Sequence, residues 1–300
     1  MGKKKIIIIT SAVIVLAIIA IIVFINIFKK DDYRLLKVFE VEGEASVTRE
    51  KIGEIEPYEN MVLESGDHIS LIKGLMTLQA DEDKFIHLEE GTEIVLNASG
   101  NADKSRTSIE LLSGGITNDV QNKLLDESSY EINTPNSTMS VRGTLFRVYT
   151  YIEDGIRYTK VSVFEGKVAS YLIFKDGTKS QEEVIVEGGK EVIIYQDDKT
   201  TDYVSGPTDI DYSDLPDSVL DVLSKAIDQG RSLPLTKEEI AALKERTVTV
   251  TFIYNGKTFA TQSVKKGEKV ALPSLKPAES GKWDYDFDLA VEEDIEINWK

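Results

Sequence analysis

Residues 133–148 read NTPNSTMSVRGTLFRV, and this stretch does most to decide how the chain folds. Residues 141–146 have the pattern of a strand, yet Gly143 weakens a strand because it offers no side chain to pack. We therefore expect either the close approach of a neighbouring strand or a positive φ angle at Gly143. Arg142 has five N–H donors, which can satisfy several carbonyls or a carboxylate. We expect a structural role for residues 141–144, with ligand contact as the alternative.

The sequence on both sides of this stretch alternates short, β-branched apolar runs with turn signals. Residues 159–164 (TKVSVF) and 191–195 (EVIIY) are typical of these runs, which predict strands. No helical period of useful length occurs between Leu35 and about Gln196. We therefore predict a mainly β domain over residues 35–196.

Glycines recur through this predicted domain at nearly even spacing. Each follows apolar and acidic or small residues and precedes a strand, and the series is Gly43, Gly66, Gly91, Gly114, Gly143, Gly166 and Gly189. The spacings are 23, 25, 23, 29, 23 and 23 residues. Even turn-and-strand units indicate a solenoid-like β arrangement, in which each unit buries its apolar face on the next. The alternative is a β-sandwich of ordinary hairpins with glycine at each turn.

Together these motifs resemble the FecR-type domain family, in which a TP-x-A-x-x-x-VRGT-x-F-x-V stretch lies between a G-x-V strand start and an EG-x-V strand end. The matching motif residues are Thr134, Pro135, Val141, Arg142, Gly143, Thr144, Phe146, Glu165 and Gly166. Segments 43–47, 63–69 and 163–168 match as well, so the resemblance covers roughly Phe39 to Ser170, and we expect the FecR-type domain to run over residues 35–196. It implies an exported, all-β domain that senses or transmits signals, or serves as a binding platform.

One departure from the family concerns the amino terminus. FecR-type regulators of Gram-negative bacteria carry a long cytoplasmic segment that acts on a sigma factor, whereas five residues precede the apolar run here. We therefore expect the extracellular part of the family's design without its own sigma-factor-binding tail.

The run from Ile6 to Phe28 has 23 residues without a charge. As a helix it would be ~34 Å long at ~1.5 Å per residue, enough to cross the hydrocarbon core of a bilayer, which is about 30 Å thick. A cleaved signal peptide is the alternative, but its apolar region is shorter and precedes a small-residue cleavage site, which is missing here. We predict an uncleaved transmembrane helix over residues 6–28.

Lysines flank this run on both sides, so charge alone orients it weakly. A short tail followed by a long apolar run is typical of a signal-anchor, whose long part is translocated. We therefore predict a single-pass protein of the cell membrane, with residues 1–5 in the cytoplasm and an extracellular ectodomain.

Residues 197–217 are acidic and contain glycine and proline, which is typical of a linker. Two short helices should follow, because residues 217–230 place apolar side chains at helical spacing and residues 236–239 form a capping box. We predict that residues 197–246 form an acidic linker with two short helices.

Strand chemistry returns at Thr247, and Asn255-Gly256 predicts a hairpin turn. Residues 247–300 resemble the Listeria–Bacteroides repeat, and the matching parts are residues 248–252, 255–256, 264–270, 273, 283 and 294–299. This resemblance implies a small β-grasp-like module that serves as a spacer or adhesive unit on Gram-positive cells. The loop before Trp283 is shorter than in the family and lacks its glycine–aromatic pair.

Composition excludes several classes of function. The chain has no cysteine, so it has no disulfide, thiolate nucleophile or Cys-ligated zinc. The net charge is −17, although every charge in the first 30 residues is a lysine. Such an acidic surface repels phosphate backbones, so we expect no nucleic-acid binding.

No residue constellation indicates catalysis, a metal or a cofactor, and we predict a non-enzymatic protein without a cofactor. We interpret the two histidines, His68 and His87, as surface or strand-packed residues. The pairs Glu89-Glu90 and Glu182-Glu183 cannot converge on one glycosidic bond, because neighbouring residues of a strand point to opposite faces. The chain contains no phosphate-binding loop or nucleophile elbow.

Two hypotheses for the function remain. The first is a non-catalytic, membrane-anchored surface protein that binds or scaffolds an unknown protein, wall polymer or carbohydrate. The alternative is a transmembrane signalling component that acts through a membrane partner, as the FecR-type resemblance implies. A hydrolase is disfavoured because no catalytic constellation supports it.

Overall fold

The computed structural model describes residues 36–101, 104–141, 143–273, 276–278 and 280–300. The transmembrane helix expected over residues 6–28 and the tail before it lie outside the described residues, as does Arg142. None of the helices that are described is both long and apolar enough to cross a membrane.

β-Strands make up most of the described structure, as the alternating sequence predicts. Within the described ranges, fifteen strands form one large sheet. In chain order they are β1 (Leu36–Arg49), β2 (Gly53–Ile55), β3 (Asp67–Ala80), β4 (Lys84–Leu88), β5 (Thr92–Ser99), β6 (Arg106–Val120), β7 (Ser129–Thr134), β8 (Ser137–Val141), β9 (Leu145–Glu153), β10 (Ile156–Glu165), β11 (Lys167–Leu172), β12 (Val184–Glu187), β13 (Lys190–Gln196), β14 (Thr201–Tyr203) and β15 (Thr208–Asp209).

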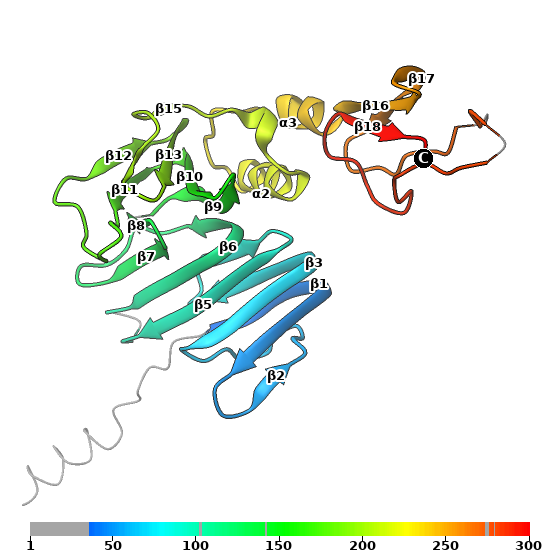
Figure 1. Ribbon diagram of the computed structural model, residues 1–300. Helices are drawn as coiled ribbons and strands as arrows, with labels where there is room; N and C mark the ends of the chain where they lie inside the picture. Colours follow the sequence, from blue (N-terminus) through cyan, green and yellow to red (C-terminus); the bar gives the residue numbers. More distant parts are fainter. Residues whose placement is uncertain (1–35, 102–103, 142, 274–275, 279) are drawn as a thin grey trace, which may run out of the picture.

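Two long strands, β3 and β6, divide the large sheet into two branches. Residues 106–113 of β6 pair with β5, whereas residues 114–120 pair with β4 and β9. Residues 67–71 of β3 likewise pair with β5, and residues 76–80 pair with β4. The first branch runs β3–β5–β6–β7–β8–β11–β12, and the second runs β3–β4–β6–β9–β10–β13. Figure 1 shows β6, β5, β3 and β1 side by side in one layer, with β9, β10 and β13 above them.

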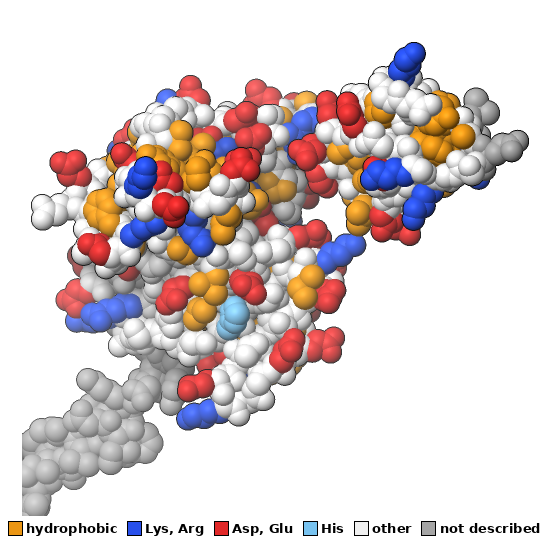
Figure 2. Space-filling model, viewed as in Figure 1, with side chains coloured by type: hydrophobic (Ala, Val, Ile, Leu, Met, Phe, Trp, Pro, Cys, Tyr) orange, Lys and Arg blue, Asp and Glu red, His pale blue; other side chains and the backbone are white. Residues whose placement is uncertain are grey.

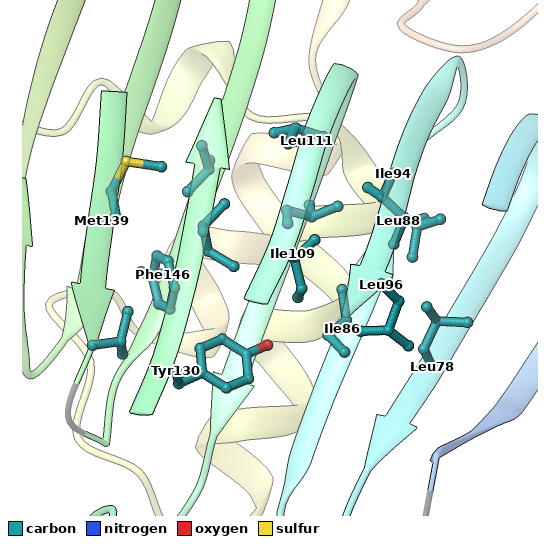
Figure 3. Packing of buried hydrophobic residues seen from close by; sticks show 14 of the residues in the cluster. Leu78, Ile86, Leu88, Ile94, Leu96, Ile109, Leu111, Tyr130, Met139 and Phe146 are labelled. Carbon is teal, nitrogen blue, oxygen red and sulfur yellow. The ribbon is translucent and has the colours of Figure 1, made fainter. Parts of the chain in front are cut away.

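One hydrophobic core is shared by the two branches. In β4 and β7 every second residue is buried, because successive side chains of a strand point to opposite faces. Ile94 of the first branch and Ile86 of the second belong to the same core, and so do the motif residues Val141 and Phe146. Figure 3 shows Tyr130 and Phe146 among the aliphatic side chains. Each fully buried Leu, Ile or Phe contributes about 1.5–3 kcal/mol, so a core of this extent needs no disulfide.

Strand pairing within the described part of the large sheet is antiparallel, apart from the parallel pair of β6 with β7. The parallel stacking of successive coils, which a solenoid requires, is therefore not shown. All seven glycines of the predicted series have a positive φ, between +75° and +96°. Gly114 lies where β6 changes partners, and Gly43 lies opposite Gly74, where β3 does so. These glycines mark bends between the branches as well as hairpin turns.

The segment after β13 packs on the outer face of the second branch. β14 and β15 pair with β13, so the beginning of the predicted linker belongs to the large sheet. A 3-10 helix (Tyr212–Asp214), α2 (Asp217–Asp228) and α3 (Lys237–Lys244) follow. We refer to residues 210–246 as the helical segment. Both predicted helices are present.

An apolar stripe holds the helical segment on the sheet. Val219, Leu220 and Leu223 of α2 form a buried cluster with Leu145 of β9 and Phe164 of β10. An amphipathic helix needs such a surface, because its apolar face is otherwise exposed to water. The predicted capping box opens α3, with reciprocal hydrogen bonds between residues 236 and 239.

A second, smaller sheet lies at the carboxyl end of the chain. It consists of β16 (Thr247–Tyr254), β17 (Lys257–Lys265) and β18 (Ile295–Asn298). β16 and β17 form the predicted hairpin around Asn255-Gly256, and β18 runs parallel to β16. The module has its own core, in which the rings of Phe252 and Trp283 lie 4.9 Å apart. Its likeness to the Listeria–Bacteroides repeat stays a prediction.

Candidate functional site

The motif residues singled out from the sequence lie at the two ends of β8. Thr134 and Pro135 lie at the turn before β8, and Val141, Gly143 and Thr144 lie at its end. Glu165 and Gly166, at the junction of β10 and β11, join the second group. The motif therefore contributes to two separate places in the fold.

A buried polar cluster surrounds Thr134. Its hydroxyl donates to Asn136 Oδ1 at 3.0 Å and lies 2.8 Å from the Ser137 hydroxyl. Thr159 of β10 donates to the same Asn136 oxygen at 2.6 Å. All four side chains are buried, whereas Pro135 is exposed. Because buried polar groups need partners, we assign this cluster a structural role, joining the β7–β8 turn to the second branch.

Gly143, Thr144 and Gly166 form a tight corner at the other end of β8. Gly143 has a φ of +77°, and a Cβ on it would lie 3.1 Å from Lys123 Cα. The Thr144 hydroxyl is buried and donates to the Lys167 carbonyl at 3.1 Å. Gly166 has a φ of +87°, and a Cβ on it would lie 2.8 Å from the Gly143 carbonyl oxygen. Gly143 thus combines a positive φ with close backbone approach.

Gly143→Val should lower the free energy of unfolding by about 1–3 kcal/mol, because valine is strained at positive φ and meets the backbone of Lys123. Gly155→Val is a matched control, since Gly155 has a φ of +78° but no atom within 4 Å of the added Cβ. We expect a lower melting temperature for Gly143→Val than for Gly155→Val, measured by circular dichroism. Parental melting of Gly143→Val combined with loss of partner binding would identify the corner as a binding surface instead.

An open groove of about 580 Å³ adjoins this corner. Gly143, Glu165 and Gly166 line one side, and residues just after α2, including Arg231, line the other. Arg231 Nη1 lies 3.1 Å from Glu165 Oε2, and its Nη2 lies 2.9 Å from Asp119 Oδ1. Asp119 is buried, so removing its cation should cost more than breaking a solvent-exposed ion pair. One guanidinium therefore ties the helical segment to the motif corner.

A row of polar side chains crosses the outer face of the second branch. The strand register aligns Glu40, Thr77, His87, Thr117, Arg147, Ser162 and Glu191. At its centre, Arg147 donates two hydrogen bonds to Glu89, from Nε at 2.7 Å and from Nη2 at 2.8 Å. The guanidinium also lies 4.6 Å from the centre of the Tyr149 ring. Arg147 and Glu89 are 5% and 9% exposed, so each needs the other's charge.

His87 lies in this row, next to α2. Its Nδ1 lies 3.0 Å from the Thr77 hydroxyl oxygen. Burial lowers the pKa of His87 to about 4, and the positive charge of Lys225 on α2 adds to the shift. The imidazole is therefore neutral at pH 7.

Acid should destabilise the protein partly through His87. The pKa of an unfolded histidine is about 6.5, so between pH 6.5 and 4 the unfolded state binds more protons than the folded state. The free energy of unfolding therefore decreases as the pH is lowered through this interval. The loss should be about 2 kcal/mol at pH 5 and about 3 kcal/mol below pH 4. Urea unfolding at pH 7 and pH 5 measures it. His87→Gln should lose less stability than the parent over this interval, with His68→Gln as the control; equal losses in the parent and His87→Gln would contradict the assignment.

No group of three or more His, Asp or Glu side chains that could hold a metal ion is found among the described residues. Glu89 and Glu90 diverge, since Glu89 is buried with Arg147 and Glu90 is exposed and accepts from the Gly74 N–H. Figure 2 shows acidic side chains scattered among basic ones on the visible face.

Sequence reasoning did not single out Asn136, Arg147 or Arg231. Arg147 carried a usable signal, because a charged residue amid the buried residues of a strand needs a buried partner. Its partner Glu89 is 58 residues away and has no local signature. Arg231 follows the glycine that ends α2, and its partners belong to β6 and β10.

The family model described as FecR protein matches residues 72–169. Residues 72–169 are therefore similar to the FecR family. The matched span contains the motif stretch 133–148 and also Glu165 and Gly166, so both ends of β8 and the corner lie within the part of the chain that resembles this family.

Similar solved structures include two crystal structures of a candidate anti-sigma factor from Parabacteroides distasonis ATCC 8503, at 1.65 and 2.50 Å resolution. Each is 13% identical to this chain, with TM-scores of 0.41 and 0.42. The alignments cover 78% and 76% of this chain and 98% of each of those chains. At these TM-scores the likeness carries no argument about function. The comparison with curated proteins found no match.

Proposed function

We propose that this chain is a non-enzymatic regulatory component that passes a signal through its FecR domain to a protein partner. The match of residues 72–169 to the FecR family carries this proposal. FecR-type domains sense or transmit signals, so the match favours signalling over the surface scaffold that was the first hypothesis from the sequence.

The contact at Arg231 supports a route for the signal. Glu165 belongs to the FecR motif, and Arg231 belongs to the helical segment that leads to the carboxyl-terminal module. A change at the motif corner would therefore alter how firmly the helical segment is held. Loss of the Arg231 charge would also leave the buried carboxylate of Asp119 without its cation, which is costly.

The proposal includes a location and a partner. Residues 6–28 anchor the chain in the cell membrane, the ectodomain lies outside, and the partner is another membrane protein. The carboxyl-terminal module serves as a β-grasp-like spacer. Protease added to intact wall-free cells should digest the chain beyond about Lys30, and a protected ectodomain would refute the location.

Depletion of the protein in its own host tests the regulatory role. Transcripts measured within minutes of depletion should change for a small set of genes, and re-expression should restore them. Arg231→Ala should restore them poorly, whereas Lys237→Ala should restore them fully. Lys237 is the matched control because its ion pair with Asp228 lies within the helical segment and away from the corner.

Two results would count against signalling. Unchanged transcripts after complete depletion would exclude a regulatory role. If the purified protein then sedimented with isolated wall polymer, the scaffold hypothesis would take its place.

A further inference from the structure

A cavity of about 140 Å³ lies between α2 and the outer face of the second branch. Its walls come from four strands, β1, β3, β4 and β6, and from α2. Gln121 and Gln229 line both this cavity and the groove at the motif corner, so the two hollows adjoin. Neither the FecR motif nor the signalling role accounts for the cavity.

The apolar wall of the cavity has the size and shape to hold one ring. Phe39 and Phe85 meet edge to face, with ring centres 5.2 Å apart, and Val222 and Ala226 of α2 face the same space. An apolar cavity of about 150 Å³ is known to accept benzene, so about 140 Å³ suits a single aromatic ring. Aromatic rings pack well edge to face, which favours an aromatic over an aliphatic occupant.

The polar wall combines acceptors with the donor groups of Lys225, Gln121 and Gln229. His87 and the carboxylates of Glu40 and Asp119 line the cavity. The contact of His87 Nδ1 with the Thr77 hydroxyl leaves Nε2 available, and this nitrogen is an acceptor when Nδ1 carries the proton. Asp119 is 6% exposed, and its Oδ1 has only the ion-pair contact with Arg231, without an aligned hydrogen bond. A carboxylate oxygen in this state can still accept a hydrogen bond from a further donor.

The charges around the cavity decide between ligand classes. Glu40 and Asp119 are the acidic residues that line the cavity, Lys225 is the basic one, and Asp119 is paired with Arg231. An anionic ligand would face two carboxylates, whereas a neutral donor can reach a lone pair of either carboxylate. We propose that this cavity binds a small, single-ring aromatic molecule that carries a hydrogen-bond donor such as a hydroxyl group. The inference stands whether or not the protein signals.

The two histidines of the chain provide a direct readout. The full chain labelled with ¹³C-histidine gives two sets of ring signals at pH 7, assigned with His68→Gln and His87→Gln. Titration with phenol should shift the His87 signals and leave those of His68 in place. Sodium benzoate should need at least a tenfold higher concentration for the same shift. Benzylamine tests whether the cavity tolerates a positive charge. If benzylamine binds more weakly than benzoate, the carboxylates of the cavity do not act as hydrogen-bond acceptors for the ligand.

A cavity-filling variant locates the site. Val222→Phe extends a partly buried side chain of α2 into the cavity and should abolish the phenol shift. Val204→Phe is the matched control, because Val204 is 55% exposed and lies outside the cavity. If Val222→Phe fails to fold, the phenol titration of the parent still tests the proposal, because it compares the His87 signals with those of His68. No His87 shift at saturating phenol, equal shifts of both histidines, or an unchanged shift in folded Val222→Phe would each overturn the proposal.

Discussion

Arg147→Ala should lower the free energy of unfolding by about 3–5 kcal/mol, because it leaves the carboxylate of Glu89 buried without a cation. Glu89 is 9% exposed and receives both of its side-chain hydrogen bonds from Arg147. Its carboxylate packs against Gly115, where an added Cβ would lie 2.5 Å from Glu89 Oε1. The loss is a large part of the about 5–15 kcal/mol that stabilises a typical domain.

Urea unfolding followed by far-ultraviolet circular dichroism measures this loss. Both tryptophans, Trp283 and Trp299, belong to the carboxyl-terminal module, so their fluorescence reports that module separately. Lys167→Ala is the control, because it breaks an exposed ion pair with Glu187 and should leave the free energy of unfolding nearly unchanged.

A double variant distinguishes a lost attraction from an unpaired charge. Arg147→Met combined with Glu89→Leu removes both charges and should be more stable than Arg147→Ala alone. If Arg147→Ala costs no more than Lys167→Ala, the pair is not the buried anchor of the second branch.

Gly74→Ala should cost about 2–5 kcal/mol, which combines the strain of an L-residue at positive φ with overpacking against backbone. Gly74 has a φ of +102°, and its Cβ would lie 2.2 Å from the carbonyl oxygen of Glu42. The facing residue Gly43 has a φ of +96° and an equally close contact with the Lys73 carbonyl oxygen. The paired strands β1 and β3 leave no space for a side chain here, so the contact can be relieved only by moving backbone.

Gly66→Ala separates the two contributions. Gly66 has a φ of +94°, but its added Cβ would have no atom within 4 Å. It should therefore cost only the about 1–2 kcal/mol of backbone strain. The melting temperature should be highest for the parent, lower for Gly66→Ala and lowest for Gly74→Ala. Equal melting temperatures of the two variants would mean that the backbone around Gly74 accommodates the added Cβ at no cost in stability.

Local sequence patterns predicted most of the strands and helices, but not how the strands are arranged in the two branches of the large sheet. The runs around residues 159–164 and 191–195 became β10 and β13, and the capping box at Thr236 opens α3. These predictions succeed because period-two burial and helix capping depend on neighbours within a few residues. The even glycine spacing was harder to interpret, because a positive φ serves a hairpin turn, a strand bend and a solenoid corner equally well.

By itself, the sequence determined the mainly β class, the FecR motif, the two short helices and the need for a special backbone at Gly143. Only the tertiary structure decided which charges meet: Arg147 with Glu89 across 58 residues, and Arg231 with Asp119 and Glu165. It also decided that the region after β13 packs on the sheet, with α2 forming one side of the cavity beside His87. The physical reason is that pairing between distant strands brings side chains together through register and crossing, which no local pattern encodes.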